Sequence, residues 1–128
     1  MKQFRFLEWQ VYGDAQELCS EIFVLVNKLP AHHRFTIGDQ LRRSCTSVIL
    51  NIAEGSGKTS DRELNRFLEI ALGSLYETLA GIDMLKRNNL VTFEDFQDLQ
   101  IKIGLICDQL GGFKKSIGTR GAVVSSKL

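Results

Sequence analysis

The sequence is poor in residues that break helices, cross-link chains or bind metals. Its 128 residues include one proline, three cysteines and two histidines. Because the single proline is Pro30, long stretches are free of helix breakers, which favours an all-helical chain. Cys19, Cys45 and Cys107 show no CxxC or Cys/His spacing and fall within apolar patterns. We therefore expect buried, small apolar side chains at these positions, and neither a redox site nor a metal site.

Long apolar runs and an excess of one charge are also missing. No window approaches the roughly 18 apolar residues of a membrane span, and the amino terminus does not resemble a signal peptide. These absences predict a cytoplasmic protein without a membrane span. The formal net charge of +1 excludes a general attraction to nucleic acid, so such binding would need local clusters. An apolar content of 44% with 24% charged residues fits one globular domain.

Recognisable catalytic constellations are absent as well. The segment from Gly55 to Ser60 reads GSGKTS and ends like a phosphate-binding P-loop, but Ile52 occupies the position where the first glycine would be required. His32 and His33 lie in an expected loop without a partner histidine elsewhere. No serine or cysteine has the context of a nucleophile. The sequence therefore predicts no catalytic residues, no metal ligands and no cofactor, and a protein that is not an enzyme.

Apolar residues at three- and four-residue spacing predict four helices. The expected helices span residues 7–29, 36–55, 60–88 and 92–118. Each of the last three opens on a hydroxyl-bearing residue followed three positions later by an acid, which is typical of helix capping. These pairs are Thr36 with Asp39, Ser60 with Glu63, and Thr92 with Asp95. Asn88 and Asn89 are expected to end the third helix, and Gly118 the fourth.

The connections between these helices are short, which forces neighbouring helices to run antiparallel. The sequence therefore predicts an all-α fold, an antiparallel up-and-down four-helix bundle over residues 1–118. Residues 119–128 carry no helical pattern, and we expect a flexible carboxyl-terminal tail.

The first expected helix has more apolar surface than one bundle would use. Leu7 belongs to its core-facing stripe, whereas Trp9, Tyr12, Phe23 and Val24 fall outside that stripe. The surplus predicts a second contact, with another copy of the chain or with a partner.

A polar stripe on the second expected helix is the most informative local feature. Its residues project within about 100° of one another, roughly opposite the core stripe. They are Arg43, Ser44, Ser47, Asn51 and Glu54. A solvated face is one explanation, but such faces are usually rich in Lys and Glu, and Ser and Asn are poor helix formers. We favour a polar seam against another helix, with Glu77 as a potential partner.

Basic residues gather in two places. The first group comprises Arg42, Arg43, Lys58, Arg62 and Arg66. The second lies near the carboxyl end and comprises Lys114, Lys115, Arg120 and Lys127. Either group could contact phosphates, although Asp61 and Glu63 dilute the first, and solubility explains the second equally well. An oligomer would multiply these patches and strengthen weak binding.

Longer motifs carry a resemblance to a known family. The segments QLRRSCTSVILNIAEG and RFLEIALGSLYET, together with the run from Asn51 to Leu85, resemble proteins encoded in intervening sequences of bacterial 23S ribosomal RNA genes. The resemblance covers nearly the whole chain and implies an antiparallel four-helix bundle that assembles as a homopentamer with a central channel. For most members no activity is established, so the resemblance implies no mechanism.

Accessory proteins of diversity-generating retroelements share this fold, and the resemblance to them implies binding to a reverse transcriptase and to nucleic acid. The positions that match are Arg43, Ser47, Asn51, Glu54, Arg66, Ser74 and Glu77. The leading hypothesis is a non-enzymatic homo-oligomer that binds RNA or DNA through basic surfaces. The alternative is a structural adaptor that binds a protein partner, such as a reverse transcriptase, without contacting nucleic acid.

Overall fold

A computed structural model of the protein describes residues 3–120, with side chains as far as Ile117. The described elements are the 3-10 helix η1 (Arg5–Glu8) and the helices α1 (Gln10–Asn27), α2 (Ala31–Arg34), α3 (Ile37–Ser56), α4 (Asp61–Arg87) and α5 (Phe93–Arg120). Within residues 3–120 there is no strand.

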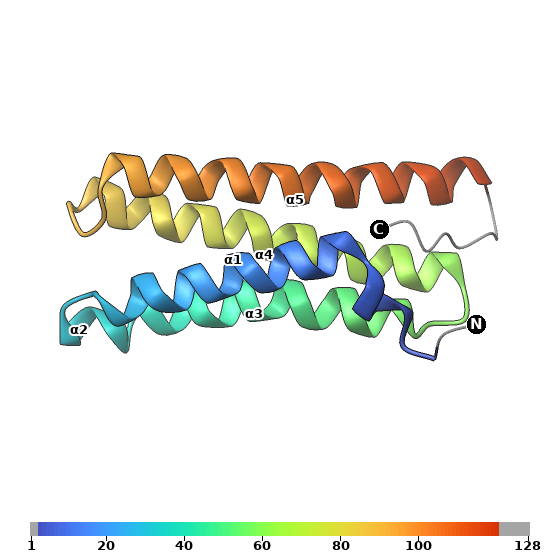
Figure 1. Cartoon of the computed structure of the whole chain (residues 1–128), viewed down its shortest axis with the longest axis horizontal. Helices are drawn as coiled ribbons and strands as arrows, with labels where there is room; N and C mark the ends of the chain where they lie inside the picture. The colour runs from blue at the N-terminus through green and yellow to red at the C-terminus, as the bar shows by residue number, and fades with distance from the viewer. Residues whose placement is uncertain (1–2, 121–128) are drawn as a thin grey trace.

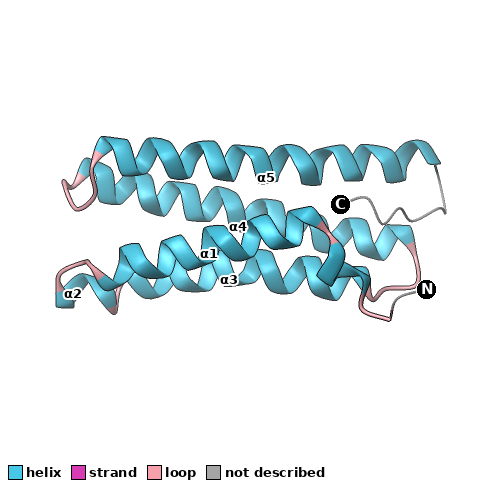
Figure 2. Cartoon of the chain, in the orientation of Figure 1, coloured by secondary structure: helices cyan, strands magenta, loops and turns pink. Residues whose placement is uncertain are grey.

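The four long helices α1, α3, α4 and α5 pack as an antiparallel bundle (Figures 1 and 2). α3 packs against α1 and α4, and α5 packs against α4 and α1, so α3 and α5 lie diagonally. The turn between α3 and α4, the helix η1 and the end of α5 lie at one end of the bundle, and α2 lies at the other (Figure 1). The predicted up-and-down four-helix bundle is confirmed.

Hydroxyl groups cap the amino-terminal ends of α4 and α5, as predicted. Ser60 Oγ accepts a hydrogen bond from the Glu63 backbone N–H at 3.2 Å, and Thr92 Oγ1 accepts one from the Asp95 N–H at 3.0 Å. The prediction was wrong for Thr36, which precedes α3 but caps no N–H group. Its hydroxyl donates instead to the carbonyl of His33, because α2 ends immediately before it.

The two asparagines after α4 end the helix as predicted. Asn89 has a φ of 58°, a left-handed conformation that asparagine adopts more readily than most residues. The Asn89 N–H donates to the Lys86 carbonyl at 3.0 Å, and the Leu90 N–H donates to the Leu85 carbonyl at 2.9 Å. These two bonds form a Schellman motif, which satisfies carbonyls that the end of a helix leaves free.

The first helix begins later than predicted. η1 ends before Trp9, whose backbone is extended, and only then does α1 begin. This break turns the indole inward, where it is 2% exposed and its ring centroid lies 5.8 Å from that of Phe113. Leu7, predicted to face the core, is 60% exposed. Arg5 holds the turn in place, since its Nε donates to the Ser56 carbonyl at 3.1 Å.

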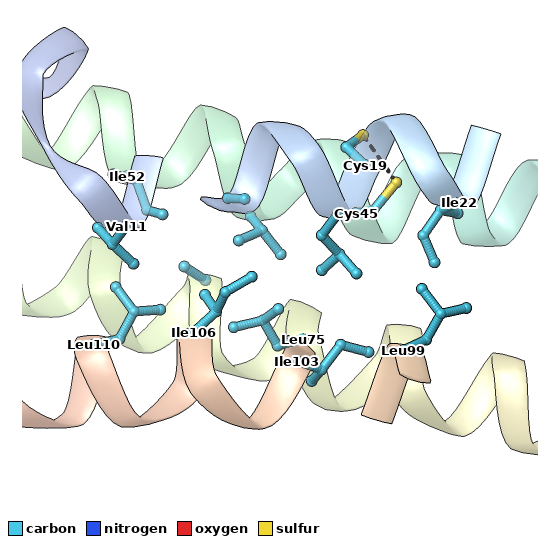
Figure 3. Close-up of a cluster of buried hydrophobic side chains, with 14 of the residues drawn as sticks. Val11, Cys19, Ile22, Cys45, Ile52, Leu75, Leu99, Ile103, Ile106 and Leu110 are labelled. Carbon is cyan, nitrogen blue, oxygen red and sulfur yellow. Dashed lines mark hydrogen bonds between the residues drawn. The ribbon is translucent and has the colours of Figure 1, made fainter. Parts of the chain in front are cut away.

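The remaining apolar stripes form one core, part of which Figure 3 shows. Phe23 and Val24 remain exposed, as their position outside the stripe predicted. Cys19 and Cys45 are buried as predicted, whereas Cys107 is only partly buried. α5 continues to Arg120, two residues beyond its predicted end. Residues 121–128, most of the predicted flexible tail, lie outside the described residues.

Candidate functional surfaces

The centre of the polar stripe joins α3 to α4 within the chain. Thr78 Oγ1 on α4 donates to Ser44 Oγ on α3 at 2.7 Å, and both residues are buried. One turn further along, the Ser47 and Ser74 hydroxyls are 2.8 Å apart. The polar seam thus has its partner helix in the same chain. Thr78 was missed by sequence reasoning, because choosing it requires the register between α3 and α4.

Two glycines keep α3 and α4 close on either side of these hydrogen bonds. A Cβ atom added to Gly55 would lie 2.9 Å from Phe67 Cβ, and one added to Gly81 would lie 2.7 Å from Leu41 Cδ2. Both distances are too short for carbon atoms in contact, so a larger residue at Gly55 would push the helices apart, whereas one at Gly81 would displace the end of the Leu41 side chain. The close approach brings the short serine and threonine side chains within hydrogen-bonding range.

The outer residues of the stripe differ from one another. Asn51 Nδ2 donates to the Ser47 carbonyl at 2.8 Å and to Ser47 Oγ at 3.0 Å. Glu77 accepts a hydrogen bond from Gln40 rather than from the stripe. Arg43 and Glu54 are exposed, and neither side chain has a hydrogen bond or ion pair within the described residues. The seam therefore ends at Asn51, and the two charged residues face outward.

Alanine at Asn51 and at Glu54 should have different effects on stability. Asn51→Ala removes a hydrogen-bonding group from a partly buried site, and we expect the free energy of unfolding to fall by about 0.5–1.5 kcal/mol. Glu54→Ala changes an exposed side chain, and we expect a change within about 0.5 kcal/mol. Urea denaturation followed by circular dichroism measures both. Equal losses in the two variants would contradict this division of the stripe.

A shallow hollow of about 510 Å³ lies over the outer face of α3. It is lined by Arg42, Arg43, Thr46, Ser47, Leu50, Asn51 and Glu54. Leu50 is 59% exposed, so an apolar side chain stands between the unpaired charges of Arg43 and Glu54. The hollow therefore combines apolar contact area with one unpaired charge of each sign, since Arg42 is paired with Asp39.

The structure divides the first predicted basic group. Arg42 donates to Asp39 Oδ1 at 2.9 Å and to Asn27 Oδ1 at 3.2 Å, so it links α3 to α1. Arg43 lies beside it, near the end of the bundle that carries α2. Thirteen residues of helix separate Arg43 from Ser56 at the other end, a distance of about 20 Å. Arg42 and Arg43 therefore do not share a patch with the rest of their group.

The other members of the first basic group lie near the second basic group in the structure. The turn after α3, the start of α4 and the end of α5 meet at one end of the bundle (Figure 1). We call five cationic residues there the basic end: Lys58, Arg62, Arg66, Lys114 and Lys115. The backbone of Arg120 ends α5 at the same end, but its side chain, like the whole of Lys127, lies outside the described parts.

Contacts with α4 hold the basic end together. Lys114 Nζ on α5 pairs with Glu69 Oε1 on α4 at 3.1 Å, one turn after Arg66. Lys58 Nζ and the Arg66 guanidinium carbon lie 5.0 and 5.7 Å from the centre of the Phe67 ring. Cations at these distances are attracted to the ring face. The aromatic ring thus brings together two cations from different elements, which the sequence did not reveal.

Acidic residues collect instead in a groove between α1 and α5, which the sequence analysis did not identify. The groove is lined by Asp14, Glu17, Glu21, Asp95 and Asp98, with apolar side chains that include Leu18, Val24, Leu25, Leu99 and Leu105. Lys102 reaches Glu21 across it, and this hydrogen bond raises the pKa of the Lys102 ammonium. Gln109 Nε2 donates to Asp14 Oδ2 at 2.8 Å. Lys28 and Lys102 also line the groove, so its five carboxylates are only partly balanced by two ammonium groups.

Two kinds of feature are absent from the described part of the chain. No group of three or more His, Cys, Asp and Glu residues there is arranged to hold a metal ion. No described helix is both long and apolar enough to cross a membrane.

A model of the family described as 23S rRNA-intervening sequence protein matches residues 8–112, from η1 to the last turns of α5. The chain belongs to this family. A crystal structure of a protein of unknown function from the S23 ribosomal protein family of Bacteroides thetaiotaomicron is similar, with a TM-score of 0.77 and 26% sequence identity. The similarity covers 82% of this chain and 98% of that one. No curated protein matches the sequence.

The family match includes the hollow over α3, the polar seam and the part of the basic end in the turn after α3 and on α4. It stops at residue 112, just before Lys114 and Lys115. The last basic residues of α5 are therefore a feature of this chain that the family model does not cover.

Proposed function

We propose that the protein is a non-enzymatic homo-oligomer that binds RNA or DNA through its basic end. The observation that carries the proposal is the convergence of Lys58, Arg62 and Arg66 with Lys114 and Lys115 at one end of the bundle. Phosphate contacts provide most of the affinity of proteins that bind nucleic acid without sequence preference. Such contacts require local positive charge, which the basic end provides despite a net charge of only +1.

Assembly is the second part of the proposal. The hollow over α3 offers Leu50 with Arg43 and Glu54 on either side, and a helix of another copy fits a surface of this kind. Similarity to the family favours a ring of five chains. One basic end carries too few free cations for tight binding, since Glu69 offsets the charge of Lys114. Several basic ends in one ring would bind a single nucleic acid more tightly than one alone.

Salt dependence tests the nucleic-acid contact. We expect a fluorescent single-stranded RNA to bind at low salt, with an affinity that falls linearly on a log–log plot against salt concentration. The double variant Arg62→Ala, Arg66→Ala removes two cations, and the slope should become shallower by about 1–2 per contacting chain. Fluorescence anisotropy from about 50 to 200 mM salt measures this slope.

The matched control removes two exposed cations from the opposite end of the bundle. Lys28→Ala with Arg87→Ala gives the same change in net charge, and we expect it to leave the slope unchanged. Equal effects of the two double variants would show that binding follows net charge and not the basic end. No binding at low salt would overturn the nucleic-acid proposal.

A second candidate function rests on the acidic groove between α1 and α5. Its carboxylates, together with exposed Val24 and Leu105, suit a basic amphipathic helix of a protein partner, such as a reverse transcriptase. This adaptor needs no contact with nucleic acid. Capture of a defined protein after nuclease treatment, lost in the variant Glu17→Lys, would favour it. Capture unaffected by Glu17→Lys would argue against the groove.

A further inference from the structure

Two thiols from different helices meet inside the bundle. Cys19 on α1 and Cys45 on α3 are 7% and 1% exposed, and their sulfur atoms are 3.0 Å apart (Figure 3). Both cysteines are free. The third cysteine, Cys107, is on α5, which packs against α4 and α1 and lies diagonal to α3.

The surroundings of the pair, more than the distance between the sulfur atoms, favour a disulfide over a metal site. Two thiolates bound to one zinc ion at 2.3 Å in tetrahedral geometry stand about 3.8 Å apart, which is wider than this pair. A disulfide bond measures about 2.05 Å, so bonding requires an approach of about 1 Å. Within the described residues, no set of ligands accompanies the pair that would complete a metal site.

We propose that Cys19 and Cys45 form a reversible intramolecular disulfide that fastens α1 to α3 when small-molecule disulfides accumulate. The oxidant class is a low-molecular-weight disulfide such as oxidised glutathione. Proteins in a reducing compartment keep such pairs as thiols, and the disulfides that form there are usually transient and redox-sensing.

The neighbours of the pair assign an order to the reaction. Cys19 is the more exposed thiol, and its sulfur lies 3.9 Å from the hydroxyl of Thr46, which lines the hollow over α3. Cys45 lies deeper, and its sulfur donates to the Arg42 carbonyl at 3.5 Å. Cys19 is therefore the residue that meets the oxidant, and Cys45 is the resolving thiol.

The exchange balances in two steps. The Cys19 thiol loses its proton and attacks one sulfur of the oxidant, which forms a mixed disulfide and releases one small thiol. The Cys45 thiol then loses its proton and attacks Cys19 Sγ, which forms the protein disulfide and releases the second small thiol. The protein loses two protons and two electrons, and the oxidant is reduced by the same two electrons.

Burial of the two thiols lowers the rate of this reaction. It raises the pKa of the Cys45 thiol far above its ordinary value, and its contact with Cys19 acts in the same direction. Because the thiolate is the attacking species, exchange is slow and requires local opening of α1 from α3. Once formed, the bond closes a loop between residues 26 positions apart, which restricts the unfolded chain and stabilises the bundle.

The test uses the full chain with Cys107→Ala, which leaves only the pair, in the presence of excess oxidised glutathione. We expect the intact mass to fall by two hydrogen atoms, with no glutathione attached. Trypsin should release residues 6–28 linked to residues 44–58, a product that dithiothreitol separates. The midpoint of thermal unfolding should rise by about 5 °C or more in the oxidised form.

The variant Cys45→Ala, also carrying Cys107→Ala, is the matched control. Without the resolving thiol, Cys19 should retain one glutathione, and the melting temperature should not rise. A stable glutathione adduct on the intact pair, thiols that remain unmodified in excess oxidant, or a cross-link between two chains would each overturn the proposal. If Cys19 in the control stays unmodified, the assigned order is wrong. Circular dichroism of each variant confirms that it is folded before oxidation.

Discussion

Replacing Trp9 by alanine is expected to lower the free energy of unfolding by about 3–5 kcal/mol, a large share of the stability of a domain this size. The indole is almost fully buried between α1 and Phe113 of α5. Its loss would leave a cavity where the start of the chain closes the core. Arg5, which lies over the same ring, would lose its contact as well.

Leu7→Ala is the matched control for this prediction, because it removes a large apolar side chain two residues away. Leu7 is exposed in η1, and we expect a change within about 0.5 kcal/mol. Chemical denaturation of both variants gives the comparison. A larger loss of unfolding free energy for Leu7→Ala than for Trp9→Ala would contradict the break at Trp9. It would support instead the continuous helix from Leu7 that the periodicity predicts.

If copies of the chain assemble through the hollow over α3, as proposed, replacing Leu50 by lysine should reduce the assembly to single chains. The side chain stands in the hollow over α3, and desolvating a lysine ammonium there, next to Arg43 as well as Glu54, is expected to cost more than one helix contact provides. Because Leu50 is exposed in the single chain, the fold itself should keep its stability within about 0.5 kcal/mol. Light scattering after size-exclusion chromatography measures the mass, and thermal unfolding monitors the fold.

Gln97→Lys adds the same charge to an exposed position on α5, the helix diagonal to α3. The assembly should keep its mass in this control. If Leu50→Lys leaves the mass of an assembled wild type unchanged, the contact between chains lies on another face, and the assignment of the hollow is wrong.

The core of the fold was predictable because its signals are local. Along a helix, residues that face the core of the bundle recur every three or four positions. A serine or an asparagine at a helix end acts on backbone groups within a few residues. Ser60 and Asn89 illustrate this. Ser60 accepts a hydrogen bond from a backbone N–H three residues later, and Asn89 adopts the left-handed conformation that ends its own helix. Such signals require no knowledge of which helices are neighbours.

The errors came from interactions that are not local. Periodicity alone assigned Leu7 to the core and Trp9 outside it, because a break in the helix resets the phase of the pattern. Packing against Phe113, 104 positions further along the chain, favours that break. Thr36 failed as a cap for a related reason, since the short helix α2 presents carbonyls to its hydroxyl.

The candidate surfaces likewise include features that the sequence predicted and features that depend on which helices are neighbours. Sequence reasoning placed Ser47 and Asn51 on one face and anticipated another helix against them, but it did not identify Thr78 as the partner of Ser44. It grouped the cations by their order in the chain, whereas the antiparallel arrangement separates Arg43 from the basic end. The proximity of Cys19 to Cys45 likewise depends on the register of α1 against α3.

Sedimentation velocity of the protein with a fluorescent single-stranded RNA, at about 50 mM salt and again at about 200 mM salt, tests the central claim most directly. At low salt we expect the RNA to sediment with a species of several times the 14.4 kDa of one chain. At the higher salt concentration the RNA should be released while the protein remains assembled. RNA that sediments alone at low salt, beside protein of single-chain mass, would contradict the account.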